Sequence, residues 1–196
     1  MKVLFFTGLL ILIGLSSFSF QIENVAIIED YIVWNQKRKL TWDDFQGKPD
    51  EKSTHKAVTS TIIRSMVNIY SDSIVDYDFV CLFEKKDSWK KVQSVNLLNH
   101  EQLHFDIGEL TTRKLRKEFL EYKFTSLDSI NPMINRIFNR ATIRLENLGN
   151  DYDKETNHGT IVEKQKIWQI KIAKELKELD RYAKTRVVIK RIKSKQ

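Results

Sequence analysis

The chain has 196 residues, of which 41% are hydrophobic and 30% charged, and its formal net charge is +7. This length suits one domain with its own core, and the 11 Phe, 6 Tyr and 4 Trp exclude a mostly disordered chain. A single cysteine, Cys81, excludes an internal disulfide and a cysteine-based zinc cluster. Any metal site must therefore be built from the 4 histidines and from carboxylates.

Residues 1–19 have the pattern of a secretory signal peptide. Lys2 is followed by a mainly apolar run over residues 3–15, and Ser17 and Ser19 fit the small residues of a cleavage site. A permanent membrane anchor is the alternative, but an anchor needs about 20 apolar residues and this run is shorter. We therefore expect cleavage after Ser19 and an exported mature protein, periplasmic or secreted, with no transmembrane segment.

The basic charge is concentrated at the C-terminus. Residues 181–196 contain 7 Lys and Arg residues and no acid, so this segment alone carries +7. We interpret it as a solvated terminus rather than a nucleic-acid site, and no nucleic-acid partner is expected. The chain then divides into a signal peptide (1–19), one domain (20–180) and a basic C-terminal tail (181–196).

The domain begins with strand patterns and continues with helix patterns. Residues 57–70 are β-branched and apolar, residues 71–73 form a turn, and residues 75–83 alternate as in a half-buried strand. These patterns predict an antiparallel hairpin or meander. Strands followed by helices define an α+β fold.

Three helices are expected after the strands. The first covers about 95–122, the second begins at Asn131-Pro132 and ends at Gly149, and the third begins at a capping box over 160–163. Residues 151–159 are expected to form a polar loop between the second and third helices.

The residues that carry chemistry lie in the first helix, where positions 100–104 read HExxH. Residues four apart lie one turn above each other, so the imidazoles of His100 and His104 can bind one ion. Glu101 lies beside them, where it can accept a proton from a water activated by the metal. Because imidazole suits zinc and hydrolysis needs no redox change, we expect Zn²⁺ as the cofactor and Glu101 as the catalytic base.

A third protein ligand must come from elsewhere in the chain. Glu109 lies 9 residues after His100 and therefore on the opposite side of a straight helix. The segment 151–159 offers Asp153, Glu155 and His158. His158 immediately precedes the predicted helix cap, which would hold it well, but a surface role in a polar loop fits the spacing equally.

Three segments together resemble the DUF922 family of bacterial secreted proteins, which are predicted to be zinc-dependent proteases. They are LTWDDFQGKP (40–49), HEQLHFDIGEL (100–110) and YDKETNHG (152–159), within a resemblance that spans roughly 34–179. The resemblance implies a zincin-like fold with His100 and His104 as zinc ligands and Glu101 as general base. It also places His158 in the family's Y-D-x-x-T-x-H-G pattern, which favours His158 as the third ligand.

Other residues allow two interpretations each. Tyr152 could stabilise the transition state as a donor to a substrate carbonyl, or pack in the core. Asp153 could orient a metal-binding histidine, or cap the loop. Trp42 and Phe45 are expected in the core rather than in a substrate cleft, and His55 is expected to be solvated and isolated.

Two functions follow from these patterns. The favoured one is an exported zinc metallopeptidase that hydrolyses peptide bonds of a peptide or protein substrate through a zinc-activated water, with Glu101 as general base. The alternative is a non-catalytic zinc-binding protein of the cell envelope that docks through its basic tail. Glu101 favours the enzyme, because a purely structural zinc site has no need of a base.

Overall fold

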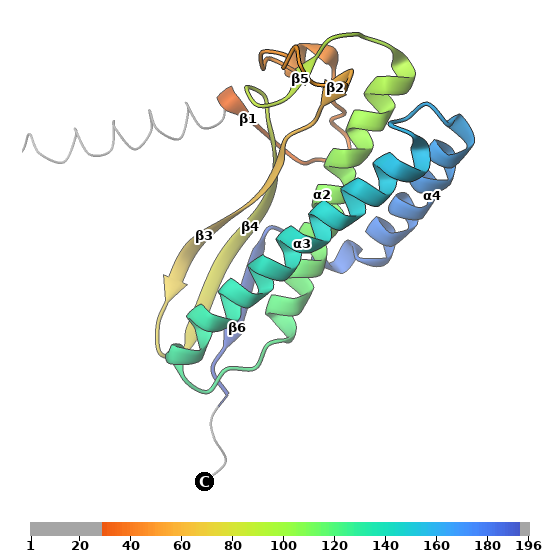
Figure 1. Ribbon diagram of the computed structural model, residues 1–196. Coiled ribbons are helices and arrows are strands. Elements are labelled where there is room, and N and C mark those ends of the chain that lie inside the picture. Colours follow the sequence, from red (N-terminus) through yellow and green to blue (C-terminus); the bar gives the residue numbers. More distant parts are fainter. Residues whose placement is uncertain (1–28, 193–196) are drawn as a thin grey trace, which may run out of the picture.

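The computed structural model describes residues 29–192, and the expected signal peptide lies outside this range. Strands occupy one side of the molecule and three long helices the other (Figure 1). The α+β class, with antiparallel strands preceding three helices, is confirmed.

The main sheet is antiparallel and is built around β4 (Ile74–Glu84). On one side β3 (Thr61–Tyr70) pairs along nearly the whole of β4. On the other side β1 (Tyr31–Val33) pairs with the end of β4, and β6 (Arg186–Lys190) pairs with its beginning. The turn predicted at 71–73 joins β3 to β4, so the predicted hairpin is confirmed.

A second, two-stranded sheet joins β2 (Ala57–Val58) to β5 (Trp89–Lys90). The predicted strand pattern over 57–70 is therefore divided between two sheets at Thr59 and Ser60. The division leaves the chain before and after β2 beside the first turns of α2 (Val95–Glu121), as Figure 1 shows.

The basic tail differs from its expectation as a solvated terminus. Its residues 186–190 form β6, in which Val187 and Ile189 are buried while their neighbours are exposed. This alternation places one apolar face on the core, and β4 supplies the hydrogen-bonding edge. The prediction of a solvated terminus is wrong for these residues, because the apolar side chains between the charges are buried against the core. Residues 193–196 lie outside the described range.

The helices begin close to the predicted positions. α2 starts at a Ser94 cap, whose side chain accepts from the backbone N–H of Leu97. α3 (Ile130–Thr156) follows, and α4 (Val162–Glu178) has no side-chain cap, so the predicted capping box at 160–163 is not formed.

The end of α3 differs from the prediction. The helix does not end at Gly149 but continues for two more turns, and residues 151–156 are helical rather than a loop. A glycine inside a helix costs only about 1 kcal/mol relative to alanine, which burial of Tyr152 and Thr156 can offset. The extension places Asp153 on a helix instead of a loop.

Three groups of buried residues form the core. The largest lies between the sheet, α2 and α3, and another lies between α2, α3 and α4. The third includes Leu40 and Phe45, which pack against β4 and α2. The expected core position is confirmed for Phe45, and Trp42 is half-buried against the same group.

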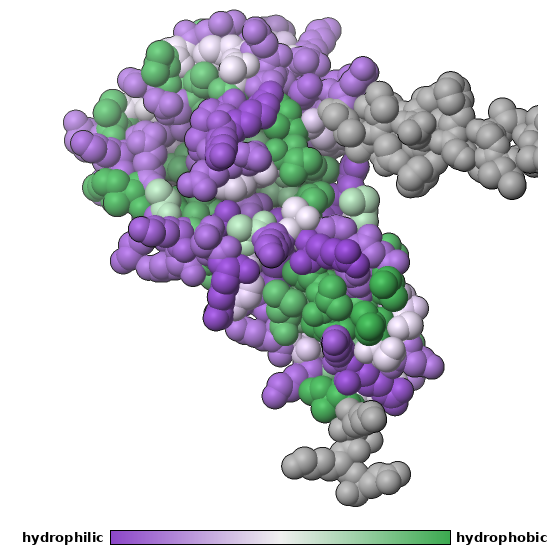
Figure 2. Space-filling view, turned by 180° about the vertical axis from the view of Figure 1, so that it is seen from behind, coloured by the Kyte–Doolittle hydropathy of each residue, from purple (hydrophilic) through white to green (hydrophobic). Residues whose placement is uncertain are grey.

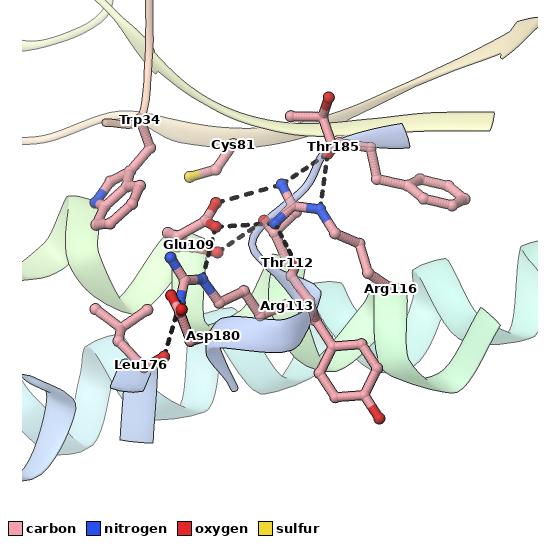
Figure 3. A network of polar contacts seen from close by, with 12 residues as sticks. Trp34, Cys81, Glu109, Thr112, Arg113, Arg116, Leu176, Asp180 and Thr185 are labelled. Carbon is pink, nitrogen blue, oxygen red and sulfur yellow. Dashed lines mark hydrogen bonds and ion pairs between the residues drawn. The ribbon is translucent and has the colours of Figure 1, made fainter. Parts of the chain in front are cut away.

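A buried ion network ties α2 to its neighbours (Figure 3). Glu109, Arg113 and Arg116 are each at most 4% exposed. Glu109 accepts from Arg113 Nε at 3.0 Å and from Arg116 Nη1 at 2.8 Å. Arg116 also donates to the backbone oxygens of Phe79 in β4 and Tyr182 after α4. Glu109 therefore has a structural role, consistent with its exclusion from the metal site on helical spacing.

The sheet face that points away from the helices is only partly polar. Met66 in β3 and Val188 in β6 are exposed on it, beside Asp76 and Asp78 of β4. Seen from behind, in Figure 2, hydrophobic residues gather in the lower part of the molecule and hydrophilic ones surround them. Within residues 29–192, no helix has the length and apolar character needed to cross a membrane.

Candidate metal centre

The HExxH sequence lies in the second and third turns of α2, as predicted. His100 is 2% exposed, and His104 lies one turn further along the same face. The Nε2 atoms of the two imidazoles are 3.3 Å apart. The two predicted metal-binding nitrogens therefore point to one place.

Asp153 completes a set of three from the end of α3. Its Oδ1 lies 3.0 Å from Nε2 of His100 and 3.0 Å from Nε2 of His104. Among the residues described, these three side chains form a group whose ligand atoms are mutually close enough to hold one metal ion. Asp153 was expected to orient a ligand or to cap a loop, with direct ligation as the competing possibility; the structure brings its carboxylate to the two nitrogens.

The spacing of the three atoms fits a zinc ion. Zinc–nitrogen and zinc–oxygen bonds of about 2.0–2.1 Å at tetrahedral angles separate the ligand atoms by about 3.3–3.4 Å. The observed separations of 3.0, 3.0 and 3.3 Å are close to these values. Two imidazoles and one carboxylate are also a donor set that catalytic zinc sites use.

Gln165 in α4 supports this interpretation through the other nitrogen of His100. Its Oε1 lies 3.3 Å from His100 Nδ1 and accepts a hydrogen bond from the Tyr152 hydroxyl at 2.6 Å. An amide oxygen can only accept, so Nδ1 would donate to Gln165 when Nε2 binds a metal ion, which is the tautomer that metal-binding histidines use. Gln165 therefore occupies the place of the outer hydrogen-bond partner that metal-binding histidines have.

The charges of the group are strongly coupled. Burial raises the pKa of Asp153, but the hydrogen bonds with His100 and His104 lower this pKa by more than burial raises it. The pKa of the carboxyl therefore lies far below its usual range. Burial lowers the pKa of His104, but the hydrogen bond and charge of Asp153 and the charge of Glu101 raise it above its usual value. The Asp153 carboxylate thus supplies a negative charge at the point that the two imidazole nitrogens face.

Glu101 lies at the edge of this group and is 3% exposed. It lines a cavity of about 450 Å³ together with His100, His104 and Asp153. Its backbone oxygen accepts from the Thr59 hydroxyl, which fixes this turn of α2 against the segment after β2. Glu101 thus lines the same cavity as the proposed metal ligands, and its charge acts on His104.

His158 lies next to the group but outside the closest set. Its Nδ1 is 3.6 Å from Asp153 Oδ1, and its side chain is 53% exposed. It belongs to a left-handed turn over residues 157–159, in which φ is 46°, 53° and 76°. The structure thus favours Asp153 over His158 as the third member of the set, which is the carboxylate alternative of the sequence analysis.

The same turn brings its glycine against a proposed ligand. A Cβ on Gly159 would lie 2.8 Å from both Cβ and Cγ of His100, closer than real contacts allow. A positive φ and this close approach both require glycine at position 159. The turn therefore forms a backing for the His100 ring.

Two other candidate residues have different roles. Tyr152 is fully buried, its ring stacks on His100 at a centroid distance of 4.6 Å, and its hydroxyl donates to Gln165. This is the packing role considered for Tyr152, and Tyr152 is not among the residues that line the cavity. Glu155 accepts from Trp168 Nε1 at 2.8 Å and is not part of the group.

Sequence reasoning missed Gln165 and His55. Gln165 lies in the third helix, beyond every motif, and its role depends on how α4 packs on α2. His55 was expected to be isolated, but it lines the cavity and its ring lies 4.9 Å from that of His158. The residues around His55 in the chain do not indicate a functional role. The chain has only 4 histidines and all 4 line this cavity, so the small number of histidines was the one indication in the composition.

A family model described as "Bacterial protein of unknown function (DUF922)" matches residues 80–159. The matched segment extends from the middle of β4 through α2 to the turn after α3, and so contains His100, Glu101, His104, Asp153 and His158. The match supports the assignment to this family, while the 40–49 motif lies outside it. No curated protein and no solved structure matches the chain.

Proposed function

We propose that the protein is an exported zinc metallopeptidase with a zincin-like active site. The observation that supports this most is the convergence of His100, His104 and Asp153 within 3.0–3.3 Å of one another, with Glu101 beside them in a cavity. Export is proposed from the pattern of residues 1–19 alone. The periplasm or the cell exterior is the expected location.

The three converging side chains would hold Zn²⁺, and zinc bound there would act as a Lewis acid on the substrate carbonyl and on water. Asp153 contributes a negative charge that balances part of the metal's charge. Gln165 keeps the proton of His100 on Nδ1, so that Nε2 is free to bind. The Glu101 carboxylate accepts a proton from the attacking water and transfers it to the leaving amine.

The cavity supports a peptide substrate rather than an apolar ligand. Its walls carry mainly polar side chains, among them Thr54, Lys56 and Asn150. Hydroxyl, ammonium and amide groups suit the carbonyl and amide groups of a peptide backbone. Besides α2, two chain segments within 54–59 and 150–160 line the cavity.

The Glu101→Gln variant tests the enzymatic proposal. The amide keeps the shape of the side chain but cannot accept the proton, so we expect zinc binding and the fold to be retained while hydrolysis falls by about 10²–10⁴-fold. The measurements are zinc content by mass spectrometry and cleavage of a fluorogenic peptide library by purified protein lacking residues 1–19.

His100→Ala is the matched control, because it should remove zinc and activity together. A Glu101→Gln variant as active as the wild type would contradict the role of Glu101. Stoichiometric zinc with no cleavage of any peptide by the wild type would instead favour the non-catalytic zinc-binding alternative.

A further inference from the structure

The cavity has a second pair of histidines, beside the proposed metal ligands. His55 comes from the segment before β2, and His158 comes from the left-handed turn after α3. The two rings meet edge to face, with centroids 4.9 Å apart and planes at 79°. Two segments about 100 residues apart in sequence thus meet at this point of the cavity wall.

The ring nitrogens of this pair are available for a ligand. Among residues 29–192, the ring of His55 has no hydrogen-bond partner, and the closest polar contact of the His158 ring is the 3.6 Å approach to Asp153. Both side chains are exposed, so hydrophobic burial of these two rings contributes little to the stability of the fold. The pair lines the same cavity as Glu101.

The backbone at His158 indicates that this arrangement is maintained at a cost. A left-handed conformation costs a non-glycine residue about 1–2 kcal/mol, and Asn157 and His158 both adopt it. Two hydrogen bonds fix the turn. The backbone N–H of His158 donates to the backbone oxygen of Asp153, and the backbone N–H of Gly159 donates to the Thr156 hydroxyl. Backbone strain of this kind gathers at functional sites.

We propose that His158 is a substrate-binding residue that donates an N–H to the carbonyl oxygen of the bond under attack, and that His55 is a positioning residue that holds the His158 ring through edge-to-face contact. A donor near the metal centre stabilises the negative charge that develops on that oxygen. His158 is next to the proposed ligand Asp153 and has a free nitrogen, which suits this role. The inference rests on the proposed peptidase function.

The test compares His158→Phe, His55→Ala and His55→Phe in the zinc-loaded protein. His158→Phe keeps an aromatic ring but has no donor, so we expect kcat to fall by about 10²–10³-fold with a small change in KM. His55→Ala should reduce kcat by about 3- to 10-fold, because it removes the aromatic contact. His55→Phe should restore most of that loss, since it restores the ring. Lys52→Ala, in the same segment but outside the cavity, should behave as wild type.

Two further measurements separate this role from others. A phosphinic analogue of the most rapidly cleaved peptide, which mimics the tetrahedral state, should bind His158→Phe more weakly by a factor similar to the loss in kcat. Zinc affinity, measured against a competing chelator, should be the same in all four variants. A large loss of zinc affinity in His158→Phe would overturn the proposal and make His158 a metal ligand, and a stoichiometry of two zinc ions per chain would make the pair part of a second metal site.

The outcomes for the two proposals are distinct. If the wild type cleaves peptides and His158→Phe cleaves them equally fast, this inference is wrong and the peptidase function stands. If the wild type holds zinc but cleaves no peptide, the peptidase function is wrong and this inference is wrong with it.

Discussion

Asp153 is the residue that decides the composition of the proposed centre. Its Oδ1 lies 3.0 Å from the Nε2 atoms of both His100 and His104. The Nδ1 atom of His158 is farther from this oxygen, at 3.6 Å. We expect Asp153→Ala to weaken zinc binding by more than about 100-fold, since even residues behind the ligands are worth about 10–100-fold. His158→Ala and Glu155→Ala should leave the affinity nearly unchanged in a chelator competition assay.

The opposite pattern would restore the ligand set implied by the family resemblance. A large loss in His158→Ala together with an unchanged affinity in Asp153→Ala would show that three histidines bind the metal.

Gly159 lies against His100 and Gly149 lies near His104, so substitutions at these two glycines form a matched pair. Gly159→Ala places a Cβ 2.8 Å from His100 at a φ of 76°, so we expect it to destabilise the fold by about 1–3 kcal/mol and to lower zinc affinity. Gly149→Ala lies inside α3, and its nearest contact is an ordinary 3.8 Å to His104 Nδ1. It should stabilise the protein by up to about 1 kcal/mol without changing zinc affinity.

Urea unfolding and zinc titration of the two glycine variants measure both effects. Equal behaviour of the two variants would show that the turn at 157–159 does not support the His100 ring.

At the scale of elements, one ion pair adds to the backbone pairing and apolar burial that hold β6 on β4. Arg186 donates to both carboxylate oxygens of Asp76, which is 1% exposed. The hydrogen bond with Arg186 lowers the pKa of Asp76 below its model-compound value of 3.8, and burial opposes this effect only in part. Because the pKa is lower in the folded state, the pair stabilises the fold above about pH 4, and this stabilisation is lost as the pH falls through the folded pKa.

Arg186→Gln should therefore destabilise the protein at pH 7 and have a progressively smaller effect as the pH falls below about 4, through the lowered pKa of Asp76. Urea unfolding at several pH values measures the difference. Lys190→Gln, on the same strand, is the control and should show little effect at either pH. A pH-independent loss in Arg186→Gln would assign its role to packing instead of charge.

The length of α3 is the element-scale feature that matters most for the site. Had the helix ended at Gly149, Asp153 would lie in a loop; because it continues to Thr156, the carboxylate is carried on a rigid helix. The helix ends in Asn157 with a left-handed φ of 46°, as an asparagine can. α3 provides Asp153, and the turn that follows it provides His158 and the backing for His100.

At the scale of the whole molecule, a metal in this centre would join α2 to α3. We expect zinc at a free concentration of 100 times its Kd to stabilise the fold by about 2.7 kcal/mol, which corresponds to a rise in Tm of about 5–11 °C for a domain of this size. Thermal unfolding followed by circular dichroism, with and without a chelator, measures this shift.

Glu101→Gln should show the same rise in Tm as the wild type, because Glu101 does not bind the metal. His100→Ala should show none. A zinc-independent Tm in the wild type would contradict the proposed ligand set.

The sequence by itself determined the α+β class, the β3–β4 hairpin, the start of α2 and the shared face of His100 and His104. These features follow from local periodicity, turn residues and helical spacing, which act over a few residues. It also restricted the remaining ligands to 151–159, because Glu109 faces the other side of α2, where the structure pairs it with Arg113 and Arg116.

Only the tertiary structure decided which residues of 151–159 and of distant segments meet at the centre. The extension of α3, the contact of Gln165 with His100 and the approach of His55 to His158 depend on packing between elements far apart in sequence. The same holds for β6. Its backbone pairs with the edge of β4, and its apolar side chains are buried in the core. Local patterns carry no information about such partners, since the free energy that selects them comes from burial and pairing in the folded chain.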